Sequence, residues 1–250
     1  MLTTEHLTLK FGGLTANNDI SLTINDGKIT GLIGPNGAGK TTFFNAISGV
    51  YPPTSGTVTF DGVRIERKRP HEINELGITR TYQVINLFRK MSVVENVMVG
   101  MHDRLTQNFF QSIFKVGSER REEKEARERA YEWLKFVGLE KRASDLAGSL
   151  SYGEQRQLEI VRGLASNPKL ILLDEPAAGM NSTEKEELNT LMGRILEKGV
   201  TIMLIEHDMK LVMNVTDYIY VLNYGKLLAQ GTPAEVQNNP DVIAAYLGGD

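Results

Sequence analysis

The feature that most constrains this chain is one short run of residues, 34–41. It reads Gly-Pro-Asn-Gly-Ala-Gly-Lys-Thr, which matches the phosphate-binding loop pattern of a glycine, four residues and Gly-Lys-Thr. Glycines let the backbone curl so that successive N–H groups converge on a phosphate chain. Lys40 can then reach the β- and γ-phosphates, and the Thr41 hydroxyl can bind Mg²⁺. The pattern predicts a nucleoside triphosphate site formed by Gly34, Pro35, Asn36, Gly37, Ala38, Gly39, Lys40, Thr41 and Thr42.

Apolar runs that alternate with helical patterns predict the fold around this loop. Residues 28–33 are typical of a short strand entering the loop, and residues 42–48 of a helix leaving it. Two further runs, 170–173 and 201–205, are apolar throughout, as expected for parallel strands buried under helices. The charged stretch after Thr183 predicts the crossover helix between them. We therefore expect an α/β fold with a P-loop NTPase core.

Two other regions depart from this βα alternation. The first part of the chain has strand-like runs, such as 7–11 and 20–24, separated by turns, with a hairpin signal at residues 61–62. Between about Ser92 and Ala165 the pattern becomes helical, and Ser92 opens a capping-box spacing. The core is therefore expected to carry an antiparallel β subdomain and a helical insertion.

Composition limits the partners and the compartment. The formal net charge of -3 gives no basic excess for binding nucleic acid. The chain has no cysteine, which rules out disulfides and cysteine-bound zinc and fits a reducing cytoplasm. The N-terminus does not resemble a signal peptide, and the apolar runs are far shorter than the roughly 20 residues that cross a bilayer. Any membrane role is therefore expected to be peripheral.

Two adjacent carboxylates, Asp174 and Glu175, follow the apolar run 170–173. Ligands bind at the carboxyl ends of such strands, and adjacent side chains on a strand point in different directions. We expect Asp174 to contact the metal through water, and Glu175 to orient and deprotonate the attacking water. Taken alone, Asp-Glu-Pro also fits a plain polar turn that closes a strand.

A second anion site is indicated by residues 151–155, Ser-Tyr-Gly-Glu-Gln, which precede a helical pattern. A serine at a helix start and a nearby glycine supply a hydroxyl and bare N–H groups, and the helix dipole reinforces them. Read by itself, Ser151 also fits an ordinary N-cap.

These three motifs, in this order and with this spacing, resemble the ATP-binding cassette (ABC) family of ATPases over residues 2–248. The resemblance implies a RecA-like core of ABC ATPase architecture and a head-to-tail dimer with two ATP molecules between its subunits. Lys40 and Thr41 of one subunit would face Ser151 and Gly153 of the other across each γ-phosphate.

Further positions match the family pattern, although each residue alone would more often be structural. Phe11 matches the aromatic residue that stacks on adenine, and His207 matches the histidine that contacts the γ-phosphate. Gln83 matches the glutamine that touches Mg²⁺ and the attacking water and signals to a membrane partner. The resemblance thus implies the catalytic residues Lys40, Gln83, Glu175 and His207, and the metal contacts Thr41, Gln83 and Asp174.

The resemblance also implies one ATPase domain over residues 1–250. Its parts would be a nucleotide-binding core with the β subdomain (1–88), a helical subdomain with the signature motif (89–165), and the rest of the core with C-terminal helices (166–250).

Three positions depart from the commonest family pattern. Tyr152 stands where glycine is usual, Glu154 where glutamine is usual, and Asn181 where aspartate is usual. Because Ser151 and Gly153 still supply the expected γ-phosphate contacts, we expect activity to survive. The role of Asn181 does not follow from the sequence.

Residues 175–181, 206–213 and 239–248 resemble the ATPase subunits of bacterial branched-chain amino acid uptake transporters, whose close relatives move urea or other amides. Such systems pair two ATPase subunits, identical or related, with two integral membrane permease subunits and an extracytoplasmic substrate-binding protein. The resemblance implies a peripheral position on the cytoplasmic face of the membrane and no nucleic acid partner. Because nothing in this chain would touch an amino acid, the substrate rests on resemblance alone.

Three alternatives are open. A soluble ABC ATPase acting on ribosomes or DNA would share the motifs, but the chain has one cassette, no coiled coil and no cysteine. A small-molecule kinase would leave residues 151–155 and His207 without a role. The cassette of the lipopolysaccharide exporter is similar over its length but carries aspartate at the position of Asn181.

One segment is left unexplained by these motifs. Three phenylalanines and an isoleucine within residues 109–114 fall on one helical face, and the charged run 119–129 is typical of a solvated helix. The aromatic face either packs within the helical subdomain or docks a membrane subunit close to Gln83. Phe110→Glu separates these two hypotheses.

Overall fold

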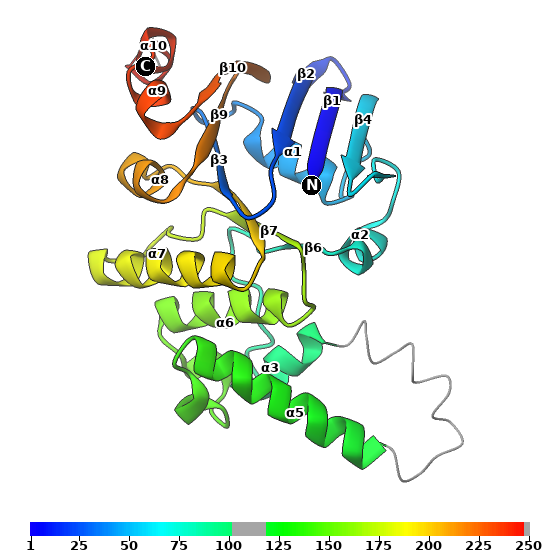
Figure 1. Ribbon diagram of the computed structural model, residues 1–250, viewed down its shortest axis with the longest axis vertical. Coiled ribbons are helices and arrows are strands. Elements are labelled where there is room, and N and C mark those ends of the chain that lie inside the picture. Colours follow the sequence, from blue (N-terminus) through cyan, green and yellow to red (C-terminus); the bar gives the residue numbers. More distant parts are fainter. Residues whose placement is uncertain (102–118, 248–250) are drawn as a thin grey trace.

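The computed structural model describes residues 1–101 and 119–247. These residues form two β-sheets with helices packed against them (Figure 1). The first sheet is antiparallel and holds, in order, β2 (Leu14–Ile24), β1 (Leu2–Phe11), β4 (Ser55–Phe60) and β5 (Val63–Arg64). The second holds, in order, β10 (Lys226–Gly231), β9 (Tyr218–Asn223), β3 (Ile29–Ile33), β8 (Thr201–Ile205), β7 (Leu170–Asp174) and β6 (Ile78–Arg80). All its pairs are parallel except β9 with β10, which form an antiparallel hairpin.

The burial pattern of the strands differs between the two sheets. Every residue of β3, β7 and β8 is buried, as their continuous apolar runs predict. Strands β1 and β2 extend toward the N-terminus beyond the predicted runs 7–11 and 20–24, and residues 2–5 of β1 also pair with β4. The predicted hairpin at residues 61–62 is confirmed, since Phe60 pairs with Val63 across it.

Helix α1 (Lys40–Ile47) is held between the two sheets. Phe43 and Phe44 are completely buried, in one apolar cluster with Leu7 of β1 and Leu172 of β7. Burial of each phenylalanine contributes roughly 2 kcal/mol by its apolar area. The N-terminus of α1, where the phosphate-binding loop ends, is therefore fixed by both sheets.

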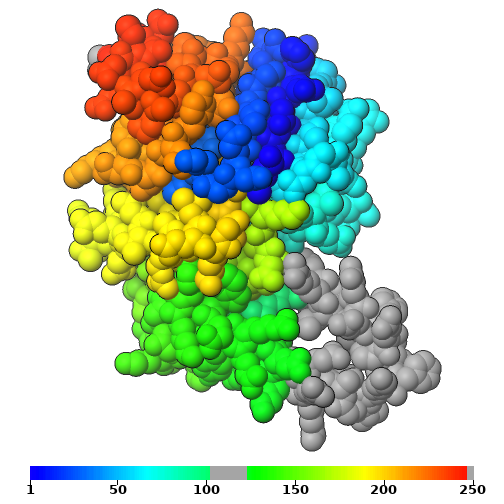
Figure 2. Space-filling view, viewed as in Figure 1, coloured from blue at the N-terminus to red at the C-terminus, as the bar shows by residue number. Residues whose placement is uncertain are grey.

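A helical layer covers the other face of the second sheet. It consists of α7 (Ser182–Glu197), α6 (Tyr152–Leu164), α3 (Val93–Gly100) and α5 (Glu119–Phe136), stacked away from the sheet in Figure 1. Val97, Leu134 and Leu158 join them in one core cluster with residues of β7 and β8. In Figure 2 the part of this layer shown in green forms one end of the molecule.

The predicted start of α3 is confirmed. The Ser92 hydroxyl accepts the Glu95 N–H at 3.3 Å, and the Glu95 carboxylate accepts the Ser92 N–H at 2.7 Å. Hydrogen bonds from Ser92 hold the pKa of Glu95 below its usual value. The aromatic face of residues 109–114 lies outside the described residues.

The remaining helices are short. They are α2 (Pro70–Leu76), α8 (Met209–Val215), α9 (Pro233–Gln237) and α10 (Pro240–Leu247), with 3-10 turns at Glu140–Arg142 and Ala147–Ser149. A small apolar cluster joins Ile33 at the end of β3 to Val212 of α8, Val236 of α9 and Val242 of α10. The C-terminal helices thus support the strand that leads into the phosphate-binding loop. Within residues 1–101 and 119–247, no helix combines the length and the apolar character needed to cross a membrane.

Candidate functional site

The phosphate loop, residues 34–39, joins β3 to α1. Gly34 and Gly39 have positive φ angles of 148° and 99°. A Cβ at Gly34 would lie 2.1 Å from the carbonyl oxygen of Leu222, and one at Gly39 would lie 2.5 Å from that of Ala16. Glycine is therefore required at both positions for the tight path into α1, whose N-terminal N–H groups favour an anion.

Lys40 begins α1 and turns back over the loop. Its Nζ donates to the carbonyl oxygens of Gly34 at 2.6 Å and Pro35 at 2.9 Å. Burial lowers the pKa of Lys40, while the negative charges of Glu175 and Asp174 oppose that shift. The ammonium group thus lies at the loop, where it can contact a phosphate group.

A cavity of about 510 Å³ opens beside the loop and brings together distant parts of the chain. Its lining residues are Leu14, Thr15, Ala16, Asn36, Gly37, Ala38, Gly39, Lys40, Thr41, Thr42, Glu175, His207, Tyr224 and Gly225. Its size lies within the usual range for ligand pockets, and the loop amides, lysine and threonines form a donor set that suits a triphosphate. The predicted carboxylate and histidine border the same space.

Glu175 follows β7 directly and is held on both of its carboxylate oxygens. Gln83 Nε2 donates to Oε2 at 2.7 Å, and His207 Nε2 lies 2.6 Å from Oε1. An ionised carboxylate can only accept, so Nε2 carries the proton in that contact. Glu175 also has a φ of 47°, a left-handed conformation that non-glycine residues rarely adopt and that is concentrated at functional sites. The structure therefore brings three predicted catalytic side chains into direct contact.

Asp174, at the end of β7, is paired with a residue that the sequence did not single out. Its Oδ2 accepts from Arg80 Nη2 at 2.8 Å, and both side chains are only 5% exposed. Arg80 Nη1 donates to Asn45 Oδ1 at 2.7 Å and Ser48 Oγ at 3.1 Å, at the C-terminal end of α1. Arg80 thus joins Asp174 to the helix that follows the phosphate loop. No sequence pattern signals this contact.

The donor set also fits Mg²⁺ together with a bound nucleotide. Among residues 1–101 and 119–247 no group of three or more His, Cys, Asp or Glu side chains could hold a metal ion. Mg²⁺ usually keeps several waters and takes one or two protein oxygens plus the oxygens of substrate phosphates. The Thr41 hydroxyl and the Asp174 carboxylate suit that arrangement.

Glu206 is a second buried acid that sequence reasoning missed. Its carboxylate accepts the N–H of Ala177 at 2.7 Å and that of His207 at 3.1 Å. Burial raises the pKa of Glu206, and these backbone hydrogen bonds oppose the shift. Glu206 therefore joins the segment after Glu175 to the segment that carries His207. The position of Glu206 directly after the buried strand β8 was the signal in the sequence that could have identified it.

Several predicted site residues lie outside the cavity lining, namely Gly34 and Pro35 of the loop, Gln83, Asp174, Phe11, Ser151 and Gly153. Phe11 packs edge-on against Tyr51 with ring centroids 5.4 Å apart, and both rings are more than 40% exposed. Ser151 and Gly153 open α6, where the Ser151 hydroxyl accepts the Glu154 N–H at 3.3 Å. The ordinary N-cap interpretation of Ser151 is thus correct within one chain.

Two departures from the family pattern have a structural reason. The ring of Tyr152 packs over Gly179, where an added Cβ would lie 3.4 Å from the nearest ring carbon. Asn181 is the N-cap of α7: its side chain accepts the Glu184 N–H at 3.0 Å, and Glu184 accepts the Asn181 N–H at 2.9 Å. The sequence left the role of Asn181 open, and the structure assigns it this cap.

This cap gives a stability prediction. Asn181→Ala is expected to lower the free energy of unfolding by about 1 kcal/mol, because one helix N–H loses its acceptor. Asn181→Asp is expected to cost nothing, because aspartate caps equally well and its charge suits the helix N-terminus. Denaturant unfolding of both variants measures the difference. An aspartate variant as unstable as the alanine variant would contradict the assigned role.

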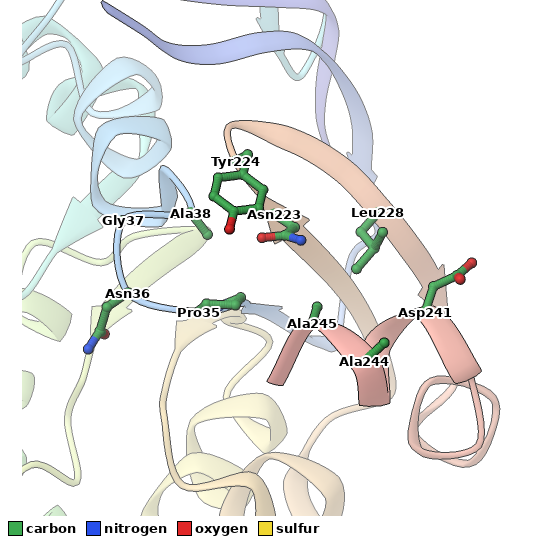
Figure 3. Close-up of a pocket in the computed structure, with 10 residues that line it drawn as sticks. All are labelled: Pro35, Asn36, Gly37, Ala38, Asn223, Tyr224, Leu228, Asp241, Ala244 and Ala245. Atoms are coloured by element: carbon green, nitrogen blue, oxygen red, sulfur yellow. The ribbon is translucent and has the colours of Figure 1, made fainter. Parts of the chain in front are cut away.

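A second cavity, of about 690 Å³, lies on another side of the phosphate loop (Figure 3). Pro35 of the loop lies opposite Ala244 and Ala245 of α10, and Tyr224 and Asn223 of the β9–β10 hairpin border the same space. Asn36, Gly37, Ala38 and Tyr224 line both cavities. The loop is therefore accessible from two sides.

Comparison with known proteins gives consistent results. The family profile described as "ABC transporter" matches residues 17–178, and the one described as "Branched-chain amino acid ATP-binding cassette transporter" matches residues 226–250. The chain is 47% identical over 249 residues to the high-affinity branched-chain amino acid transport ATP-binding protein BraF of Pseudomonas aeruginosa, covering 99% of this chain and 98% of that protein.

Two solved structures are similar along nearly the whole chain. One is the ADP conformation of an ATP-binding cassette of an ABC transporter, with a TM-score of 0.86, 32% identity, and coverage of 99% of this chain and 98% of that one. The other is a dimeric structure of a bacterial ABC transporter cassette, with a TM-score of 0.76, 27% identity, and coverage of 93% and 99%.

Proposed function

The chain belongs to the ABC transporter family of ATP-binding proteins, and from this membership we propose that it hydrolyses ATP to power import of branched-chain or related amino acids. The family and the fold class predicted from the motifs are confirmed. The observation that carries the hydrolytic role is the contact of Glu175 with both Gln83 and His207 at the edge of the phosphate-loop cavity. The amino acid substrate is inferred from the relatives.

In this proposal Glu175 orients the attacking water and accepts its proton. Gln83 and His207 hold the two carboxylate oxygens, so the carboxylate keeps one orientation toward the cavity. Lys40 and the loop amides bind the phosphates, and His207 contacts the γ-phosphate. Mg²⁺, held by Thr41, by Gln83 and through water by Asp174, would neutralise charge on the phosphates. The exposed ring of Phe11 would stack on adenine.

The protein is proposed to act as a dimer with a second copy or a related ATPase subunit. Ser151 and Gly153 open α6 and do not line the loop cavity of their own chain, and the resemblance to ABC ATPases assigns them to the ATP of the other subunit. The similarity to a dimeric cassette supports this arrangement.

Membrane permease subunits are proposed to dock in a groove close to Gln83, which would place the protein on the cytoplasmic face of the membrane. The groove has a volume of about 280 Å³ and lies between α2, α3 and α6. Phe88 and Val99 line it and are 49% and 38% exposed, and Val84 beside Gln83 is 79% exposed. Exposed apolar side chains gathered in one place suit a permanent protein partner. An extracytoplasmic binding protein would act through those permease subunits.

Reconstitution tests the proposed function. The chain, co-purified with permease subunits encoded beside it, is placed in liposomes with the matching binding protein, and uptake of labelled leucine is measured. We expect uptake that requires ATP on the side of this chain and hydrolysis that rises with loaded binding protein. Uptake of urea or an amide instead of leucine would reject the substrate class. Hydrolysis without any associated permease would favour a soluble ABC ATPase.

A further inference from the structure

We propose that Arg156 and Glu159 of α6 form a buried clamp that positions Gln83, and through it Glu175; this inference rests on the proposed function of Glu175. The Arg156 and Glu159 side chains are 0% and 1% exposed, and Arg156 Nη1 lies 2.6 Å from Glu159 Oε2. Taking two charges out of water is costly unless further hydrogen bonds satisfy both groups. The partners of this pair therefore indicate what it does.

Those partners are all backbone groups of one segment, residues 82–86. Arg156 Nη1 donates to the Tyr82 carbonyl oxygen and Nη2 to that of Gln83, each at 2.7 Å. The other oxygen of the Glu159 carboxylate accepts the Asn86 N–H at 3.1 Å. Each end of the segment is thus bonded to the same buried pair.

This segment needs such an anchor because it follows β6 without continuing the sheet. Strand β6 ends at Arg80, and the last backbone bond to the sheet is from Thr81 N–H to the Leu172 carbonyl. Within the described part of the chain, residues 82–86 make no backbone–backbone hydrogen bond. Residues 82, 83 and 86 are themselves exposed, and the planar guanidinium group and the carboxylate of the buried pair supply partners for their backbone groups.

The clamp leads directly to the proposed catalytic base. Arg156 holds the backbone carbonyl of Gln83, and the Gln83 side chain donates to Glu175. The same helix begins at the N-cap Ser151, which is proposed to serve the ATP of the other subunit. The contacts thus connect the start of α6 with the base of the chain's own site. Glu159 also lines the groove between α2, α3 and α6, but neither Arg156 nor Glu159 touches the phosphate-loop cavity or Glu175, so they are positioning residues.

The main test removes both charges together. Replacing a buried ion pair by apolar residues usually preserves stability, whereas removing one partner leaves a buried charge unpaired. We therefore choose the double variant Arg156→Met with Glu159→Leu. Arg156→Lys keeps the charge but not the two-pronged geometry and serves as a milder second variant. Gln157→Met is the matched control, because Gln157 is on the same helix but its side chain contacts Glu187 of α7 instead.

Two kinds of measurement separate positioning from general stability. In the double variant we expect kcat for ATP to fall about tenfold with little change in KM, because the base is displaced while the phosphate loop is intact. Without nucleotide, amides of residues 82–88 should exchange roughly tenfold faster or more, while those of β7 do not change. In a Gln83→Ala background the double variant should add less than about a twofold loss, because both changes act through one side chain.

The inference is overturned if the folded double variant keeps the kcat and exchange rates of the Gln157→Met control. It is also overturned if the losses from Gln83→Ala and from the double variant multiply. If the double variant does not fold, the same measurements on Arg156→Lys decide. A wild-type protein without ATPase activity would reject the proposed function instead, and hydrogen exchange would still test whether Arg156 and Glu159 anchor the segment.

Discussion

Glu175→Gln is expected to lower ATP turnover by about a hundredfold or more while nucleotide binding survives. Loss of a general base typically costs two to four orders of magnitude in rate. The loop glycines do not depend on the carboxylate charge, and Lys40 keeps its contacts with the Gly34 and Pro35 carbonyls and the nearby charge of Asp174, so the triphosphate remains bound. A subunit pair that binds ATP without hydrolysing it should accumulate as a dimer in size-exclusion chromatography with Mg-ATP.

The local geometry makes this test specific. Gln83 and the His207 ring both donate to Glu175, and a glutamine at position 175 can still accept from one of them. The loop should therefore keep its place while the base is lost. Glu128→Gln, an exposed change on α5, is the control for the charge difference. A Glu175→Gln protein that hydrolyses ATP at nearly the wild-type rate would show that another group acts as the base.

The features that could be predicted from the sequence have local signals. The phosphate loop is a contiguous pattern, and the buried strands β7 and β8 are continuous apolar runs. The cap of α3 follows from Ser92 and the glutamate three residues later. Asn181 and Glu184 have that same spacing, so the capping rule could also have found the role of Asn181.

The features that could not be predicted join residues far apart in the chain. Arg80 pairs with Asp174, and Arg156 reaches the carbonyl of Gln83, across separations of 94 and 73 residues. In each case the arginine has an ordinary local context, and only the packing of β6 beside β7 and of α6 beside residues 82–86 brings the partners together. The left-handed conformation of Glu175 likewise has no sequence signal, because few residues other than glycine, asparagine and aspartate adopt it.

A mixed-subunit experiment is expected to show that Ser151 serves the ATP held by the other subunit. Each proposed site combines Lys40 of one subunit with Ser151 of its partner. With Ser151→Arg in one subunit and Lys40→Ala in the other, one site receives both lesions and the other receives none. With both changes in one subunit opposite a wild-type partner, each site carries one lesion.

The two arrangements therefore give opposite results for the two possible roles of Ser151. If it acts across the interface, the first dimer should keep up to about half of the wild-type activity and the second only background, because loss of phosphate positioning costs orders of magnitude in rate. If Ser151 acts within its own chain, the order reverses. Differently tagged subunits give dimers of defined composition. The test stays valid even when the two sites hydrolyse only together, if Glu175→Gln is added to every subunit and the trapped ATP per dimer is counted. One trapped ATP in the first arrangement and none in the second supports the shared site. Equal trapping in both arrangements would refute it.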